Sequence, residues 1–202
     1  MDALLQFESN ILLWIQNNLR NDFTDPIVKF ITHLGDHGYL WIALLLILLC
    51  IPKTRKAALI GAATLLLTFI ITNLCLKPLI ARTRPYEVIE GLTILIEKQS
   101  DRSFPSGHTA NSMAVGVILW KISRNYGKLG DKKLYFPKAA GWFFLILSIL
   151  IGLSRLYVGV HYSTDVLGGA IIAIVDAVVV FAIYKKLRIC GAGNSLQKNK
   201  RI

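Results

Sequence analysis

Residues 166–184 read VLGGAIIAIVDAVVVFAIY, an apolar run in which Asp176 is the one charged side chain. An α-helix rises about 1.5 Å per residue, so roughly 20 residues cross the ~30 Å hydrocarbon core of a bilayer. The run therefore predicts a membrane-spanning helix. Four further apolar runs precede it, at residues 38–52, 56–76, 107–123 and 139–157. We expect an all-α integral membrane bundle of five transmembrane helices.

The composition agrees with a membrane protein and excludes an ordinary soluble domain. Of the 202 residues, 54% are hydrophobic, and the mean hydropathy of +0.53 is high for one soluble domain of this length. The three cysteines are scattered without a C-x-x-C spacing, so neither a disulfide framework nor a zinc site is expected. Three parts are predicted: an N-terminal interfacial helical segment (1–36), a transmembrane core (37–188) and a disordered cytoplasmic tail (189–202).

The N-terminal segment, residues 1–36, does not form a clean span. Its apolar side chains alternate irregularly with polar ones, and Asp22, Asp25 and Pro26 interrupt them. This mixture predicts one or two amphipathic helices that lie on the outer interface of the membrane. A sixth, poorly formed span is the alternative. A signal peptide is not expected, because the segment has neither a basic start nor a continuous apolar stretch.

The net charge of +11 is distributed in a way that indicates membrane topology. Of 23 Lys and Arg residues, 15 lie in residues 53–56, 121–138 and 185–201, whereas ten of the 12 acids lie in the alternate segments. The positive-inside rule then places the basic loops and the C-terminus in the cytoplasm. Nucleic acid is not an expected partner, because no basic patch is interleaved with aromatic residues. The segments left outside are 1–37, 77–106 and 158–165.

The first of three polar clusters at the outer ends of the apolar runs is KPLIARTRP, residues 77–85. Lys77 and Arg84 are seven residues apart, so on one helix they would share a face and converge on one anion. The planar fork of Arg84 suits phosphate oxygens, and Lys77 adds a point charge. The alternative is a pair of cations that snorkel to the membrane boundary.

The second polar cluster is SFPSGH, residues 103–108, which opens an apolar run. Backbone N–H groups at a helix start point toward an anion, and the helix dipole favours negative charge there. Gly107 lets the backbone approach a ligand closely, and Ser106 adds a hydroxyl donor. The alternative is an ordinary helix start, although His108 beside it favours a functional site.

The third polar cluster is SRLYVGVHYSTD, residues 154–165. If this stretch is helical, Asp165 lies one turn after His161 and can accept a proton from one ring nitrogen, which leaves the other nitrogen free as a nucleophile. Arg155 adds a third cation. The alternatives are an interfacial histidine, an aspartate that caps a helix, and an arginine paired with a lipid headgroup.

Together these clusters supply what phosphoryl transfer needs: cations for the equatorial oxygens, a nucleophile and an acid for the leaving group. The motifs K-x6-R-P, P-S-G-H and S-R-x5-H-x3-D occur in this order. They resemble the three signature motifs of the type-2 phosphatidic acid phosphatase superfamily. The resemblance extends over about residues 26–188.

The resemblance implies a role for each matching residue. His161 attacks phosphorus and becomes phosphohistidine, Asp165 orients it, and His108 protonates the leaving oxygen and then activates water. No metal and no cofactor are implied, and the sequence has no acidic pair or His/Asp cluster suited to a two-metal site. The residues implied in phosphate binding are Lys77, Arg84, Ser106, Gly107 and Arg155.

The resemblance further implies a lipid phosphatase that acts on a lipid diphosphate or phosphate. It is greatest to short bacterial members, some of which act on undecaprenyl diphosphate. Undecaprenyl diphosphate is therefore the substrate that we expect first. We expect the protein in a bacterial-type plasma membrane, with its active site on the outer face. A phosphatidic acid or phosphatidylglycerophosphate phosphatase, a lipid phosphotransferase and a non-catalytic anion-binding transporter are alternatives. The partners expected are the lipid substrate and membrane lipids, without an obligatory protein partner.

Two further features have open roles. Asp176 lies inside the last apolar run, where an acid usually faces the bundle interior or water. It is expected to make a structural hydrogen bond, to Thr72 or Asn73, or else to serve substrate access or proton movement. The loop 86–104 mixes apolar and charged residues. It is expected to cover the pocket or meet the lipid chain, or else to be a solvated loop with a small apolar anchor.

Overall fold

The computed structural model describes the backbone of residues 3–125 and 134–199, and the side chains of this part as far as Arg188. Within these residues the elements are all helical, which confirms the predicted fold class. The α-helices are α1 (Ala3–Asn18), α2 (Thr24–His33), α3 (Tyr39–Cys50), α4 (Arg55–Phe69), α5 (Lys77–Ile80), α6 (Gly107–Asn125), α7 (Lys138–Tyr157) and α8 (Ser163–Asn199). Shorter helical elements are η1 (Asp36–Gly38), η2 (Ile70–Leu76) and η3 (Pro85–Glu87).

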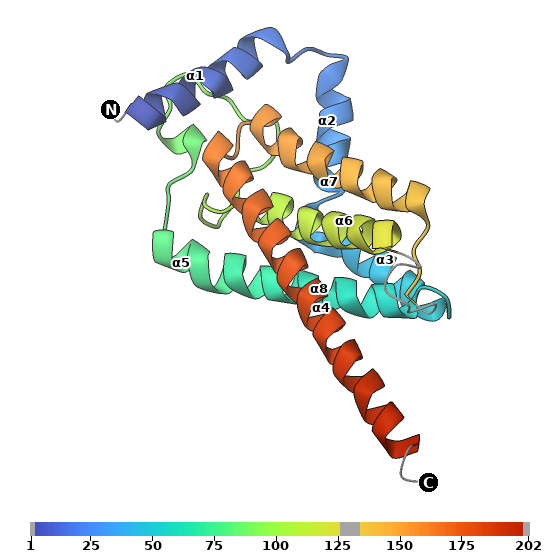
Figure 1. The fold of residues 1–202 in the computed structure, drawn as a ribbon. Coiled ribbons are helices and arrows are strands. Elements are labelled where there is room, and N and C mark those ends of the chain that lie inside the picture. Colours follow the sequence, from blue (N-terminus) through green and yellow to red (C-terminus); the bar gives the residue numbers. More distant parts are fainter. Residues whose placement is uncertain (1–2, 126–133, 200–202) are drawn as a thin grey trace.

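Helix α6 is the centre of the bundle, where it packs against α7, α8 and α4 (Figure 1). Most of its side chains are buried. A Cβ added at Gly116 would lie 2.8 Å from the carbonyl oxygen of Phe144 in α7, so glycine permits this close approach of the two helices. On another side, the indole N–H of Trp41 in α3 donates to Ser112 Oγ at 2.8 Å. The polar side chains of α6 thus serve contacts within the protein.

Fewer helices meet the length and hydropathy expected of a membrane span than the five that were predicted. Among the described residues, three helical stretches are long and apolar enough to cross a membrane, and a fourth is obtained if α2 and η1–α3, bent by 43°, count as one span. All five predicted runs are helical, but α6 is not among the candidates. Because protein surrounds α6, its side chains need not be as apolar as those that face lipid. Five spans therefore stay a prediction, and the three stretches are Arg55–Glu87, Lys138–Tyr157 and Ser163–Arg188.

The outer faces of the bundle are apolar, as expected for contact with lipid. Leu59 of α4, Phe143 of α7 and Ile171 of α8 have exposed fractions of 58%, 60% and 60%. Many further leucine, isoleucine and valine side chains on the same helices are exposed. So many exposed apolar side chains on the helices of the bundle indicate a surface that lipid covers. The chain is a multi-pass membrane protein.

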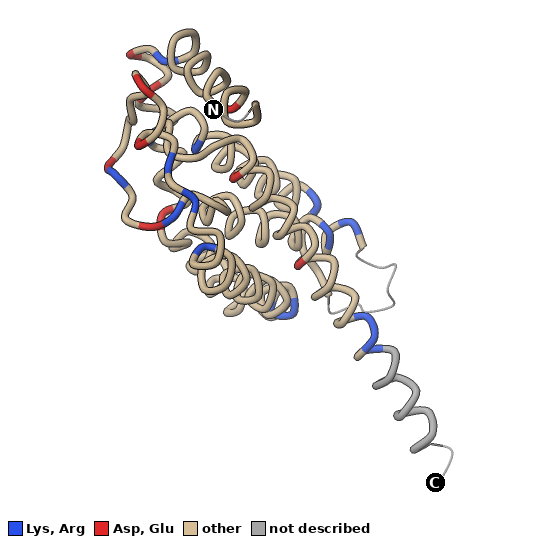
Figure 2. The backbone as a smooth tube through the Cα atoms, turned by 90° about the vertical axis from the view of Figure 1, so that its left-hand side faces the viewer, with Lys and Arg blue, Asp and Glu red and all other residues tan. Residues whose placement is uncertain are grey.

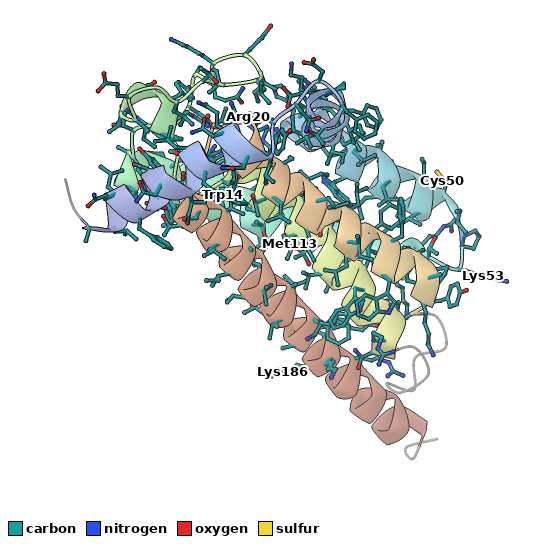
Figure 3. All side chains as sticks on the ribbon, turned by 90° about the horizontal axis from the view of Figure 1, so that it is seen from above. Trp14, Arg20, Cys50, Lys53, Met113 and Lys186 are labelled. Carbon is teal, nitrogen blue, oxygen red and sulfur yellow. The ribbon has the colours of Figure 1, made fainter. Side chains whose placement is uncertain are left out.

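The N-terminal segment contributes two helices that differ in their position. Helix α1 lies across the end of the bundle where α7 ends and α8 begins, whereas α2 packs along α7 (Figure 1). Seen from above, Trp14 and Arg20 of this segment lie away from Lys53 and Lys186 (Figure 3). The interfacial position predicted for residues 1–36 stays a prediction. The boundary placed after residue 36 separates α2 from helices that it contacts.

The charges divide between the two ends of the bundle (Figure 2). Apart from Asp176 in α8, the described acidic residues gather at the end that α1 covers, and the described charges of the opposite end are Lys and Arg. This is the separation on which the predicted topology rests. The backbone of α8 is helical to Asn199. The side chains of residues 189–202 lie outside the description, so the disordered tail stays a prediction.

Candidate active site

The three polar clusters meet at the end of the bundle that α1 covers. They surround a cavity of about 620 Å³. Predicted site residues and members of the loop 86–104 line this cavity together. The loop is therefore part of the pocket, which favours its predicted role as a cover over that of a solvated loop. The predicted site residues in the lining are Lys77, Arg84, Gly107, His108 and His161.

Lys77 and Arg84 converge, but not on one helix face as the spacing predicted. The helix formed by α4, η2 and α5 ends at Ile80, and Ala81 adopts a left-handed conformation with φ of 50°. This turn reverses the chain, and Arg84 follows with an extended backbone. The two cations therefore meet through a turn, which a periodicity argument does not foresee. Lys77 Nζ lies 3.3 Å from the position that a Cβ on Gly107 would occupy, so glycine leaves room for it.

Asp101 of the loop 86–104 joins the two cations and was missed in the sequence. Its carboxylate oxygens accept hydrogen bonds from Lys77 Nζ and Arg84 Nη2, and its carbonyl accepts one from Arg84 Nε at 2.9 Å. Burial alone would raise the pKa of Asp101, but Lys77 and Arg84 outweigh burial and lower it to about 2. The carboxylate is therefore ionised and binds both cations.

The helix start at residues 105–108 has features of both predictions, an ordinary helix start and a part of the site. Ser106 caps α6, because its Oγ accepts the backbone N–H of Thr109 at 3.4 Å. Gly107 and His108 line the cavity, whereas Ser106 is fully buried behind them. The Ser106 backbone N–H also donates to the carbonyl oxygen of Asp165 at 3.1 Å, which joins the second and third clusters.

His161 and Asp165 lie together at the start of α8. Asp165 Oδ2 is 3.4 Å from His161 Nδ1, and it accepts the backbone N–H of Tyr162 at 2.9 Å. Asp165 is thus both a cap of the helix and the partner of the histidine. On the other edge of the ring, His161 Nε2 lies 3.3 Å from Arg84 Nη1 and borders the cavity.

The electrostatic environment keeps His161 neutral. Burial lowers its pKa to about 3, and the positive charges of Arg84 and Arg155 act in the same direction, against Asp165. A neutral imidazole whose Nδ1–H faces a carboxylate carries its lone pair on Nε2. The unprotonated nitrogen of His161 is therefore the one on the side of Arg84 and the cavity.

Arg155 lies behind the cavity and is fully buried. Its Nη1 donates to Thr32 Oγ1 of α2 at 2.7 Å. Its Nε and Nη2 are buried and have no partner within the described part of the chain. Unpaired guanidinium nitrogens in a buried position are costly, and Arg155 is not among the residues that line the cavity.

His108 has a carboxylate partner that sequence reasoning also missed. Its Nε2 lies 2.8 Å from Asp36 Oδ1, and the other oxygen of Asp36 lies 2.8 Å from His33 Nδ1. Asp36 precedes the first apolar run and stands between His33 and His37. This cluster of titratable residues was the signal that could have placed it in the site.

Asp176 has a hydrogen-bond partner, but not one of those predicted. Thr68 Oγ1 donates to Asp176 Oδ2 at 2.7 Å, and both side chains are buried. The predicted partner Thr72 lies one turn further along the continuous helix of α4 and η2. Its hydroxyl donates to the carbonyl oxygen of Thr68 instead. The contact is a hydrogen bond within the bundle, as the first of its two expectations required, and the role of Asp176 stays a prediction.

Comparison with known proteins identifies the family. A model of the PAP2 superfamily matches residues 57–189. Undecaprenyl-diphosphatase BcrC of Bacillus subtilis (strain 168) is 31% identical over 172 residues, which cover 83% of this chain and 79% of the relative. The bacitracin transport permease protein BcrC of Bacillus licheniformis is 28% identical over 176 residues, or 85% of this chain and 78% of the relative.

A solved structure is similar over most of the chain. The first transmembrane PAP2-type phosphatidylglycerolphosphate phosphatase from Bacillus subtilis matches with a TM-score of 0.72 and 26% identity, over 92% of this chain and 88% of that one. The chain therefore belongs to the PAP2 superfamily, as the three motifs predicted. It is a membrane lipid phosphatase.

Proposed function

We propose that this phosphatase hydrolyses a long-chain lipid diphosphate, with undecaprenyl diphosphate as the first substrate, through a phosphohistidine intermediate and without a metal. The observation that carries a lipid substrate is a pair of neighbouring pockets that share lining residues, and the choice of a diphosphate rests on a relative. An apolar groove of about 480 Å³ between α3 and α4 shares His37, Phe69 and Asn111 with the polar cavity. A headgroup in the cavity would place its chain in the groove, against leucine side chains. The BcrC relative from Bacillus subtilis acts on such a lipid by its name.

The first half-reaction follows from the histidine at the cavity. His161 Nε2 attacks the terminal phosphorus, a P–N bond forms, and the P–O bond to the lipid phosphate breaks. The Nδ1 proton stays on the ring and faces Asp165 Oδ2, which stabilises the positive charge that develops on the imidazole. Arg84 next to Nε2 would hold a non-bridging phosphate oxygen, which keeps the leaving oxygen opposite Nε2 for in-line attack.

The reaction needs an acid in its first half and a base in its second half. His108 gives a proton to the leaving oxygen and then takes one from the water that attacks phosphorus, which releases inorganic phosphate and regenerates His161. Asp36 faces Nε2 of His108, so the proton exchanged is that of Nδ1, which His108 carries in its imidazolium form. Lys77, Arg84 and Arg155 neutralise the charge of the transferred group together with donors at the start of α6, Ser106 and Gly107.

A phosphatidylglycerophosphate or phosphatidic acid phosphatase is the second candidate. Its support is the fold match to a phosphatidylglycerolphosphate phosphatase. The groove offers apolar contacts that suit acyl and isoprenoid chains alike, so the choice depends on rates.

The test is phosphate release from undecaprenyl diphosphate, phosphatidic acid and phosphatidylglycerophosphate by the purified protein. We expect the diphosphate to give the highest kcat/KM and excess EDTA to leave the rate unchanged. A higher kcat/KM for either phospholipid would establish the second candidate, and loss of activity in EDTA would contradict the metal-independent reaction. Adding an alcohol tests for a phosphotransferase, because a phosphorylated alcohol would then replace inorganic phosphate. Anion binding without turnover would favour the transporter.

We further propose that the active site faces the outside of the plasma membrane and that the basic end faces the cytoplasm. The support is that the described acids, Asp176 apart, lie at the cavity end, whereas the described charges at the opposite end are Lys and Arg (Figure 2). In intact cells, a membrane-impermeant maleimide should label Glu97→Cys in the cavity loop but not Lys53→Cys between α3 and α4. Cys50 and Cys75 are free and exposed, so all three native cysteines are first replaced by serine. The reverse labelling pattern would invert the topology.

A further inference from the structure

Helix α1 carries a carboxylate that is fully buried although the helix lies at the end of the bundle. Glu8 has no exposed surface. Its Oε1 accepts hydrogen bonds from the backbone N–H of Thr164 at 2.9 Å, from Thr164 Oγ1 at 2.7 Å and from Ser163 Oγ at 3.2 Å. Its Oε2 accepts a hydrogen bond from Arg82 Nη2. A buried charge is costly unless it is paired and hydrogen-bonded, and Glu8 meets both conditions.

Arg82 connects Glu8 to the catalytic pair. While Nη2 binds Glu8, Nη1 donates to Asp165 Oδ1 at 2.6 Å and to Thr164 Oγ1 at 2.7 Å. The guanidinium carbon lies 3.8 Å from the centre of the Tyr162 ring. A guanidinium that stacks on a ring and bridges two carboxylates is held in one orientation, which a lysine cannot reproduce.

Asp165 is fixed through both oxygens as a result. Arg82 holds Oδ1, and Ser103 Oγ and the Tyr162 N–H hold Oδ2, the oxygen that faces His161 Nδ1. We propose that Glu8 and Arg82 are positioning residues of this phosphatase, which hold the carboxylate of Asp165, and through it His161, in the orientation for attack. The inference rests on the proposed phosphohistidine reaction.

Anchoring of α1 alone does not account for this arrangement. Apolar contacts, such as that of the buried Leu12, attach α1 to the bundle without any charge. The chain Glu8–Arg82–Asp165 instead alternates in sign and ends on the partner of the nucleophile. Neither Glu8 nor Arg82 lines the cavity. We therefore expect their loss to lower kcat and to leave KM unchanged, whereas a loosened fold would lower stability without this selectivity.

The test compares Glu8→Gln, Arg82→Met and the double variant on the lipid that the wild type hydrolyses fastest. Arg82→Met leaves two carboxylates without their shared cation, so we expect kcat to fall about 10²-fold, the loss that follows a misplaced reacting group. Glu8→Gln keeps Arg82 on Asp165 and should lower kcat about tenfold. The double variant removes the surplus carboxylate and should have a higher kcat than Arg82→Met alone, because the two residues act as one unit.

Arg102→Met is the matched control, because Arg102 is exposed in the neighbouring loop, and it should retain wild-type kcat. Thermal unfolding in detergent is measured for every variant. If Arg82→Met does not fold, Glu8→Gln and Arg82→Lys decide, with a kcat below that of the control expected for both. Wild-type kcat in these two, a rise in KM at constant kcat, or a double variant equal to the product of the single losses would overturn the inference. A wild type without phosphate release from any lipid would instead remove the proposed function.

Discussion

Replacement of His161 by alanine should lower phosphate release on the order of 10⁴-fold or more, the largest single loss in the chain, because a nucleophile and its partner act as one unit. The neutral Nε2 at the cavity is the nitrogen that we expect to attack phosphorus. Asp165 orients the ring and does not attack phosphorus, so it cannot replace His161. Initial rates at saturating substrate measure the effect. Phosphate bound to the wild-type protein after an alkaline quench, and absent from the variant, would demonstrate the intermediate.

His161→Asn is the matched control for this experiment. Asparagine retains a polar side chain of similar reach but no nucleophilic ring nitrogen, so both variants should be inactive and equally stable. An asparagine variant with more than a few per cent of wild-type activity would show that water attacks the substrate directly. In that case His161 would only hold the phosphate.

Replacement of His108 by alanine should separate two kinds of substrate. A lipid diphosphate expels a phosphate monoester, which is a good leaving group, whereas a monoester expels a poor alkoxide that needs a proton. General acid catalysis contributes ~10²–10⁴-fold where it is needed, so monoester hydrolysis should fall by that factor and diphosphate hydrolysis by less. The ratio of the two kcat values, measured on phosphatidic acid and undecaprenyl diphosphate, reports the effect.

Asp36→Asn tests the same chemistry through the partner of His108. The amide can still hydrogen-bond to Nε2 but carries no charge, so the same selectivity should appear with a smaller loss. Equal losses on both substrates in His108→Ala would show that its contribution is not the delivery of a proton to the leaving group. Asp36 would then be a structural partner only.

The sequence predicted the helices well, because they depend on short-range patterns. Each apolar run is helical, and His161 and Asp165 are paired as predicted, although His161 precedes α8 and does not lie on it. The convergence of Lys77 and Arg84 was predicted for the wrong reason. A single left-handed residue, Ala81, replaces the continuous helix, and an alanine in that conformation has no sequence signature.

The supporting carboxylates were beyond sequence reasoning. Glu8 and Arg82 are 74 residues apart, and Asp36 and His108 are 72 apart. Ion pairs over such distances depend on which helix ends meet, and no periodicity encodes this. The span count was not confirmed for a related reason. A high hydropathy is expected of helices that face lipid, whereas α6 is surrounded by other helices. Its serine, threonine and glycine residues suit close helix packing and lower its hydropathy.

The contact of Asp101 with Lys77 and Arg84 bears on which membrane components enter the site. Any incoming headgroup competes with a carboxylate tethered to the same chain, which has the advantage of a high effective concentration. A free fatty acid offers the same two oxygens and one charge, so it gains nothing by exchange. A phosphate group offers more oxygens and more charge and can displace the loop. The enzyme would thereby resist inhibition by the abundant singly charged amphiphiles of a bilayer.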